Sequence, residues 1–375
     1  MQTRILTAIT LMLGMAGIAA AHERAVEFPK TEEGKVILAA DLHTHTVFSD
    51  GEVWPSIRVK EARKDGLQML AVTEHLEHQP HKEDIPHPDR NRSYEVATEA
   101  LEAGDGRELF VINGAEVTRG QPHGHINAVF LDDANALLTD SPRAAIEAAN
   151  EQGAFVFLNH PNWVPQQPDG IARLSDYHRE LIADGLLHGI EVANGTLDGH
   201  SEHALEIALG EGLTVLGTSD IHGLVDWTHD AGNGGHRPMT LVIAETRSPE
   251  AMKTALLNGD TVAWNYDDLL GKAENVEKVV KACLSLSVSS YPDESAVLPV
   301  DIVNNCPLNF TLQNTSRVTF QNTSDVVRIE RDDHFTVHAR TGERVAEVSL
   351  DFSVLNTQTG FRENLDISLS ADVPR

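Results

Sequence analysis

The sequence VILAADLHTH, residues 36–45, decides the fold predicted for this chain. Val36–Asp41 is an apolar run of strand length, and His43 and His45 follow it at once. Residues two apart in an extended chain point to the same side, so the two imidazoles can hold one metal ion. The stretch therefore predicts an apolar strand that delivers metal ligands at its carboxyl end.

The same pattern recurs through the first two-thirds of the chain, where short apolar runs alternate with amphipathic, helix-like stretches. Strands are predicted at Val36–Asp41, Leu67–Thr73, Glu108–Glu116, Ile126–Leu131, Ala154–Asn159, Gly189–Ala193, Thr214–Thr218, Thr240–Ala244 and Thr261–Trp264. Helices are predicted at Pro55–Asp65, Ser141–Gln152, Ser201–Glu211 and Ser248–Asn258. Repeated strand–helix units indicate an α/β fold with a largely parallel sheet, and seven or more units indicate a closed or nearly closed barrel.

Potential metal ligands follow nearly every predicted strand. In barrels of this kind the chemistry sits at the carboxyl ends of the strands. Besides His43 and His45, the residues in that position are Asp50, Glu74, His75, Glu116, His123, His125, His160, Asp220 and His222. A single histidine beside a strand is most often a hydrogen-bonded structural residue, whereas a series gathered at one mouth predicts a metal centre.

The order of these motifs resembles that of the polymerase-and-histidinol-phosphatase (PHP) family. The motifs are His43-Thr44-His45, Ser49-Asp50-Gly51, Thr73-Glu74-His75, Glu116, His125, Asn159-His160-Pro161 and Ser219-Asp220-Ile221-His222. Family members include histidinol phosphate phosphatases, phosphodiesterases that cleave small nucleotides, and the proofreading domain of some DNA polymerases. The resemblance therefore implies a distorted (β/α)7-type barrel and a metal-dependent phosphoesterase. One departure is Glu74, where many relatives have Asp before the histidine.

The resemblance also implies the ligands of two or three divalent metal ions. His43, His45, Glu116 and Asp220 would hold the first ion, Glu116, His125 and His160 the second, and Asp50, His75 and His222 the third. Of His123 and His125, the family pattern favours His125, which leads directly into a strand. Because the ligand atoms are all nitrogen and oxygen, Zn²⁺, Mn²⁺ and Fe²⁺ are suitable ions.

These positions lead to a hypothesis for the reaction. A hydroxide bridging the two metals that share Glu116 would attack phosphorus in line, and either Asp220 would accept the proton of the nucleophile or His222 would assist the leaving group. The candidate substrate-binding residues are Arg119, Glu191, Asn194 and Arg237. Glu191 and Asn194 can alternatively contact the metal-binding histidines. Residues 79–92, rich in His, Pro and Asp, are predicted to form a lid.

The charge of the chain narrows the substrate class. A formal net charge of -28 repels phosphate backbones, so long nucleic acid is not expected as a substrate. A small phosphodiester is the preferred substrate, because a monoester dianion calls for more cations than Arg119 and Arg237 supply. The alternatives are a phosphomonoester phosphatase, a carboxylic ester or carbamate hydrolase on the same metals, and a non-catalytic metal-containing binding protein.

The two ends of the chain differ from the barrel region, residues 22–275. Residues 1–21 combine Arg4, an apolar run shorter than the ~20 residues of a membrane span, and a small-residue cleavage site at Ala21. They predict a signal peptide and a periplasmic or secreted protein. Residues 280–375 predict a β-sandwich accessory domain whose last strand is Val348–Val354, with the boundary in Asp268–Lys281. The two cysteines, Cys283 and Cys306, can either pair or remain free thiols.

Overall fold

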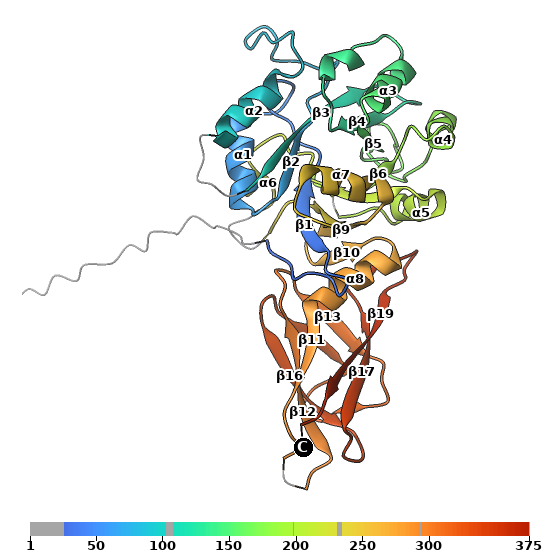
Figure 1. Cartoon of the computed structure of the whole chain (residues 1–375). Coiled ribbons are helices and arrows are strands. Elements are labelled where there is room, and N and C mark those ends of the chain that lie inside the picture. Colours follow the sequence, from blue (N-terminus) through green and yellow to red (C-terminus); the bar gives the residue numbers. More distant parts are fainter. Residues whose placement is uncertain (1–25, 103–107, 198, 231–234, 293, 375) are drawn as a thin grey trace, which may run out of the picture.

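The computed structural model describes residues 26–102, 108–197, 199–230, 235–292 and 294–374. The predicted signal peptide, residues 1–21, lies outside this range. The described residues form an α/β domain and, beneath it in Figure 1, an all-β domain. Among the helices of the described residues, none is both long and apolar enough to cross a membrane.

One curled sheet of eleven strands organises the α/β domain. Its order is β18-β10-β9-β8-β1-β2-β3-β4-β5-β6-β7. The strands are β1 (Val36–Asp41), β2 (Met69–Val72), β3 (Phe110–Thr118), β4 (His125–Val129), β5 (Phe155–Leu158), β6 (Gly189–Asn194), β7 (Thr214–Thr218), β8 (Met239–Ala244), β9 (Thr261–Asn265), β10 (Asp268–Leu270) and β18 (Thr357–Gln358). The α/β class is thereby confirmed.

The sheet is mixed, where the sequence predicted a largely parallel one. Strands β1, β2 and β3 run parallel to one another, as do β5, β6 and β7. Strand β4 is antiparallel to both of its neighbours, and β8 is antiparallel to β1. The short segment 119–124 between β3 and β4 accounts for the first reversal, because a parallel crossover needs a dozen or more residues.

Side-chain hydroxyls join β7, at one end of the strand order, to β8 and β9, which lie inside the other end. The Thr240 hydroxyl on β8 accepts from the Gly217 amide and donates to the Gly217 carbonyl on β7, at 3.1 and 2.8 Å. The Thr261 hydroxyl on β9 donates to the Val215 carbonyl at 2.7 Å. The barrel is therefore closed by threonine side chains instead of a backbone ladder, and the strand ends gather at one mouth.

Helices and one 3-10 turn connect these strands. They are α1 (Pro55–Lys64), α2 (Arg92–Glu102), η1 (Ala134–Leu137), α3 (Pro142–Glu151), α4 (Asp176–Ala183), α5 (Glu202–Glu211), α6 (Val225–Thr228), α7 (Pro249–Asn258) and α8 (Ala273–Cys283). Ser141, Ser201 and Ser248 each accept a hydrogen bond from the backbone N–H three residues later. These caps explain why α3, α5 and α7 start where the sequence predicts.

The all-β domain is a sandwich of two four-stranded sheets, β11-β12-β16-β14 and β15-β13-β17-β19. The strands are β11 (Leu284–Val288), β12 (Val297–Asn304), β13 (Phe310–Asn314), β14 (Thr319–Phe320), β15 (Val326–Ile329), β16 (His334–Arg340), β17 (Glu347–Val354) and β19 (Leu365–Asp372). Strand β19 lies beyond the last strand predicted. Its signal is present, because Leu365, Ile367 and Leu369 alternate with exposed residues.

The two domains share a hydrophobic core. The segment predicted to hold the boundary, Asp268–Lys281, contains β10 and most of α8. Strand β10 pairs in parallel with β18, so the second domain adds a strand to the first sheet. Val276 and Val279 of α8 are buried in a cluster that includes residues of both domains. Cys283, at the end of α8, forms a disulfide with Cys306, which resolves the question of their pairing.

Candidate metal centre

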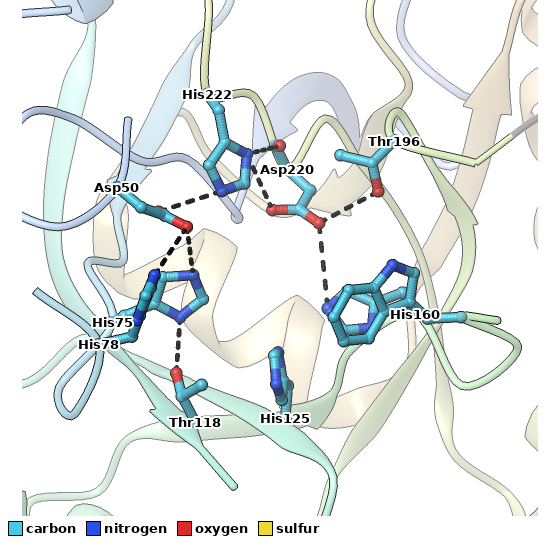
Figure 2. A pocket seen from close by; sticks show the side chains of 10 residues that line it. Asp50, His75, His78, Thr118, His125, His160, Thr196, Asp220 and His222 are labelled. Atoms are coloured by element: carbon cyan, nitrogen blue, oxygen red, sulfur yellow. Dashed lines mark hydrogen bonds and ion pairs between the residues drawn. The ribbon is translucent and has the colours of Figure 1, made fainter. Parts of the chain in front are cut away.

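The carboxyl ends of the barrel strands surround a cavity of about 390 Å³. Figure 2 shows the side chains that line it, with the imidazoles and carboxylates turned toward one another. The lining residues are Asp50, His75, His78, Thr118, His125, His160, Trp163, Thr196, Asp220 and His222. Beneath them lie His43, His45 and Glu116, which are fully buried. The nine predicted ligands therefore come together at one place.

The first group of ligands joins the ends of β1, β3 and β7. Oδ1 of Asp220 lies 3.2 Å from Nε2 of His43 and 3.1 Å from Nε2 of His45. Oε2 of Glu116 lies 3.5 and 3.4 Å from the same two nitrogens. Four atoms about 2.1 Å from one zinc ion lie roughly 3.4 Å apart, so this spacing suits a metal at their centre.

The second group surrounds the other side of the Glu116 carboxylate. Its Oε1 lies 2.8 Å from Nδ1 of His125 and 3.8 Å from Nε2 of His160. Nδ1 of His75 lies 2.7 Å from Oε2. His123 instead offers its backbone carbonyl to the ring of His178, at 2.8 Å. The geometry therefore agrees with the choice of His125 over His123.

The third group is centred on Asp50 and faces the open side of the cavity. Oδ1 of Asp50 lies 3.2 Å from Nε2 of His222, and Oδ2 lies 3.4 Å from Nε2 of His75. His45 stands within reach of the same group, its ring stacked on those of His75 and His222. The three groups thus overlap, as expected where neighbouring metal ions share ligands.

Several buried donor and acceptor atoms in this cluster have no hydrogen-bond partner among the described residues. They are Nε2 of His43 and His45, Oδ1 of Asp50, Oε2 of Glu116 and Nδ1 of His125. Burying such atoms without partners is costly, so their convergence on one spot calls for a bound cation. The donor set of imidazoles and carboxylates matches divalent zinc, manganese or iron.

The charges of the cluster lead to the same conclusion. Burial raises the pKa of Glu116, but His75 and His43 lower it by more, so the carboxylate stays charged. Burial lowers the pKa of His75, but Glu116 and Asp50 raise it to about 10. Burial and His75 together lower the pKa of His45 to about 3. The raised pKa of His75 shows that the surrounding carboxylates favour a positive charge at this place. A bound metal ion would supply that charge.

Glu191 fixes the orientation of His43 from behind. Its Oε1 lies 2.7 Å from Nδ1 of His43 and accepts from Thr218, while Oε2 accepts from the His160 backbone and from Asn194. Glu191 and Asn194 are buried and do not line the cavity. They were candidates for substrate contact. The structure places Glu191 in its alternative role, as a partner of the candidate metal-binding histidines, whereas Asn194 donates to Glu191 and, at 3.3 Å, to Asp220.

Glu74, the departure from the family pattern, holds the turn that carries Asp50. Its buried carboxylate accepts hydrogen bonds from the Thr46 amide at 3.1 Å, from the Thr46 hydroxyl at 2.5 Å and from the Ser49 hydroxyl. Glu74 therefore acts through the shape of residues 46–50 and not as a metal ligand. The longer side chain of Glu reaches this turn from the end of β2.

Two predicted substrate-binding arginines are occupied elsewhere, which corrects their assignment. Arg237 is fully buried and pairs with Asp41 at 2.9 Å and Asp65 at 2.8 Å. Asp41 in turn accepts from the amide and hydroxyl of Ser219, which precedes Asp220. Arg119 pairs with Glu77 at 2.8 Å and does not line the cavity. Neither arginine is among the residues that line the metal cavity.

The backbone is strained at two of the ligands. His160 has a φ of 24° and Asp220 has a φ of 49°. Both values lie in the left-handed region, which residues other than Gly seldom adopt. His160 lies two residues after the end of β5, and Asp220 lies two residues after the end of β7. Such strain is kept where the surrounding structure enforces it, and it is common at functional sites.

Four cavity residues lie outside the predicted ligand and substrate-binding sets, namely His78, Thr118, Trp163 and Thr196. The ring of Trp163 lies 5.4 Å from that of His125 and 5.2 Å from that of His160. Thr118 ends β3 and contacts Nδ1 of His75 at 2.6 Å, and Thr196 donates to Asn194. Their position just beyond strand ends is the signal that could have identified them.

A barrel whose mouth carries overlapping groups of imidazoles and carboxylates defines a metal-dependent hydrolase. Comparison with known proteins narrows this class. A solved two-domain protein of Bacteroides vulgatus, which contains a predicted PHP-like metal-dependent phosphoesterase, is 33% identical, with a TM-score of 0.84 over 94% of this chain and 100% of that one. The chain belongs to the PHP-like metal-dependent phosphoesterases.

Two further comparisons agree with the division of the chain. An uncharacterized protein of Methanocaldococcus jannaschii is 37% identical over 200 residues, which are 51% of this chain and 84% of that protein. A family profile described as an Ig-like domain matches residues 284–370, which hold β11 to β19 almost completely. The C-terminal sandwich predicted from the sequence is confirmed.

Proposed function

We propose that this chain is an exported phosphoesterase that hydrolyses small phosphodiesters. The observation that carries the proposal is the convergence of unpartnered, buried nitrogen and oxygen atoms on one cavity at the barrel mouth. No hydrogen bond among the described residues satisfies those buried atoms. A group of metal ions that binds and polarises a phosphoester would satisfy them as ligands.

The ligand groups follow the geometry of the cluster. His43, His45, Glu116 and Asp220 would hold one ion, Glu116, His125 and His160 a second, and Asp50, His75 and His222 a third. When bound, such ions lower the pKa of coordinated water, polarise the phosphoryl group and neutralise its developing charge. Asp220 and His222 line the cavity and stand where a proton can be accepted from the nucleophile or given to the leaving group.

The absence of lysine and arginine from the lining favours a diester over a monoester. Among the described residues that line the cavity there is no cationic side chain other than histidine. A monoester dianion is usually held by additional guanidinium or ammonium groups, while a diester carries one negative charge. Trp163 provides an apolar wall beside His125 and His160, where the second substituent of a diester can pack.

The same lining supports a second candidate, hydrolysis of a carboxylic ester or carbamate. An uncharged carbonyl substrate needs no cationic side chain either, and a polarised carbonyl suits the same cluster. Reaction rates must therefore distinguish the two candidates.

The test compares three nitrophenyl substrates on the mature chain, with metal content measured by elemental analysis. We expect two or three metal ions per chain and turnover of bis(p-nitrophenyl) phosphate at least about tenfold faster than of the monoester. Faster turnover of p-nitrophenyl acetate would move the assignment to the carbon ester. Bound metal without turnover of any substrate would indicate a binding protein, and absence of metal would refute the site.

Export rests on residues 1–21 and gains support from the second domain. The disulfide between Cys283 and Cys306 is of a kind that persists in oxidising compartments and is rare in the cytosol. A periplasmic or secreted phosphodiesterase could convert phosphodiesters outside the cell into phosphomonoesters and alcohols. The Ig-like domain is proposed to be a structural appendage of the barrel.

A further inference from the structure

A second cavity, of about 630 Å³, lies beside the loop that leads from β2 to α2. Its lining does not overlap with that of the metal cavity. Phe48 and Trp54 contribute from the segment before α1, and Asp84, His87, Asp89 and Arg92 contribute from the loop. Its volume is in the range of pockets that hold small molecules.

His87 brings an unsatisfied hydrogen-bonding atom to this cavity. Its side chain is almost completely buried, with 8% exposed, and Nδ1 lies 2.5 Å from the carbonyl oxygen of Ile85. Because Nδ1 donates to that carbonyl, Nε2 of the neutral ring is an acceptor. This Nε2 is buried and has no partner among the described residues. A ligand that donates a hydrogen bond would satisfy it.

The loop that carries His87 is held in place. The guanidinium of Arg90 donates to the His87 carbonyl at 3.0 Å, and the Arg90 amide donates to Asn135 at 2.9 Å. Asp89 accepts from Asn135 at 2.7 Å. These bonds tie the loop to η1, so the cavity is built by fixed contacts and the acceptor has a defined direction.

Aromatic rings and carboxylates give the cavity its preference for positive charge. The Phe48 ring lies 4.8 Å from that of His87 and 5.2 Å from that of Trp54, which is 43% exposed. Aromatic faces attract organic cations. Asp84 and Asp89 add two carboxylates.

The single cation in the lining does not cancel these charges. The guanidinium of Arg92 is bound to Glu95 at 2.9 Å and to Glu99 at 3.2 Å, so its charge is already neutralised. An anion would meet a net negative lining, which excludes a second phosphate-binding position. A neutral donor would satisfy His87 but would leave the charge of the carboxylates uncompensated.

We propose that this cavity binds a small organic ammonium ion that carries at least one N–H group. The N–H donates to Nε2 of His87, the charged group faces the rings of Phe48 and Trp54, and Asp84 and Asp89 neutralise it. The site is separate from the metal centre, and the proposal does not rest on the phosphodiesterase function.

Three probes that share a benzyl group test both requirements. Benzylammonium has the charge and the donor, benzyl alcohol has a donor without charge, and benzyltrimethylammonium has charge without a donor. Titration calorimetry on the metal-loaded mature chain at pH 8 should show benzylammonium binding about tenfold more tightly than either of the others. Equal affinity for benzyl alcohol, or no binding of benzylammonium, would overturn the proposal.

Variants then locate the bound ion. His87→Phe keeps a ring but removes the acceptor, and Trp54→Leu removes an aromatic face, so each should weaken benzylammonium binding about tenfold. Trp227→Leu removes a tryptophan that is 82% exposed and lies outside the lining, and it should leave binding unchanged. His87→Gln retains an acceptor and should keep most of the affinity, which guards against misfolding as the cause. Unchanged binding in His87→Phe would refute the site.

Discussion

Glu116 is the residue at which the ligand groups meet, and its two oxygens have different neighbours. Oε2 faces His43, His45 and His75, while Oε1 faces His125 and the amide of Asn159. A bridging carboxylate requires this arrangement, because each oxygen must serve a different ion. Its buried place near the carboxyl end of β3 keeps both oxygens away from bulk water.

Glu116→Gln should remove metal and activity together. The substitution keeps the size of the side chain but replaces one charged oxygen by an amide donor that faces imidazole nitrogens. We expect at least one metal ion fewer per chain by elemental analysis and a loss of diester turnover of about 100-fold or more. Glu211→Gln, at the exposed end of α5, is the matched control and should change neither. Full metal content with normal turnover would contradict the bridging role.

Glu191→Gln should weaken metal binding without abolishing catalysis. Glu191 does not line the cavity, and it orients His43 through the 2.7 Å contact with Nδ1 while its other oxygen accepts from the His160 amide. Loss of such a partner typically costs roughly 10- to 100-fold in metal affinity. Competition with a chelator should reveal this loss, and turnover should recover when the metal ion is in excess. A rate that stays low at saturating metal would instead assign Glu191 a role in the reaction.

The ligands could be predicted from sequence, but the partners of the arginines could not. Nearly every candidate ligand follows an apolar strand, His125 begins the antiparallel strand β4, and these strand ends meet at the barrel mouth whatever their distance in the chain. Arg237 also lies near a strand end, yet its partners Asp41 and Asp65 are more than 170 residues away in the chain. Burial of a charged residue in an ion pair depends on tertiary contacts that no local pattern reveals.

At the scale of single elements, α1 acts as a brace behind the metal centre. Arg58, on its buried face, donates to the carbonyls of His45, Ile221 and His222 at 2.8, 3.1 and 2.7 Å. These carbonyls belong to the two segments that follow β1 and β7. One side chain thus holds together the two loops that supply Asp50 and Asp220.

Arg58→Met should loosen this brace. Methionine fills much of the same volume but leaves the buried carbonyls without donors, at a cost of about 3 kcal/mol of folding free energy. Thermal unfolding should show a Tm lower by several degrees, and metal content should fall. Lys60→Met, an exposed position on the same helix, controls for the loss of a positive charge. A Tm equal to that of the wild type would show that the carbonyls find other donors.

The starts of several helices could be predicted from the sequence, whereas the directions of the strands could not. Helices capped by Ser141, Ser201 and Ser248 start at the predicted residues because the capping bond is local. The antiparallel course of β4 and β8 depends on which strands pair, which is a property of the whole sheet. Strand β18 joins β10 by contacts across 87 or more residues of chain, and no short pattern predicts it.

At the scale of the whole molecule, the two domains form a continuous structure. Helix α8 leaves the barrel and continues into β11, and one hydrophobic cluster runs from Ile37 in β1 to Leu369 in β19. The disulfide ties the end of α8 to Cys306, which follows β12. The bond therefore fixes the point at which the barrel passes into the sandwich.

The position of the disulfide links the stability of the fold to the proposed export of the protein, because such bonds form and persist in oxidising compartments. A disulfide closing a loop with a sequence separation of 23 stabilises a fold by about 3 kcal/mol, chiefly by restricting the unfolded chain. Full-length protein made in a bacterial host should begin near His22 after processing and contain no thiol that an alkylating reagent can label. Leaderless protein kept in the cytosol should label at both cysteines and unfold at a lower temperature until it is oxidised.

A Cys283→Ser, Cys306→Ser double variant should match the reduced protein in Tm. Retention of residues 1–21 by the full-length protein, or free thiols after export, would contradict the proposed compartment, because the leader and the disulfide test it independently.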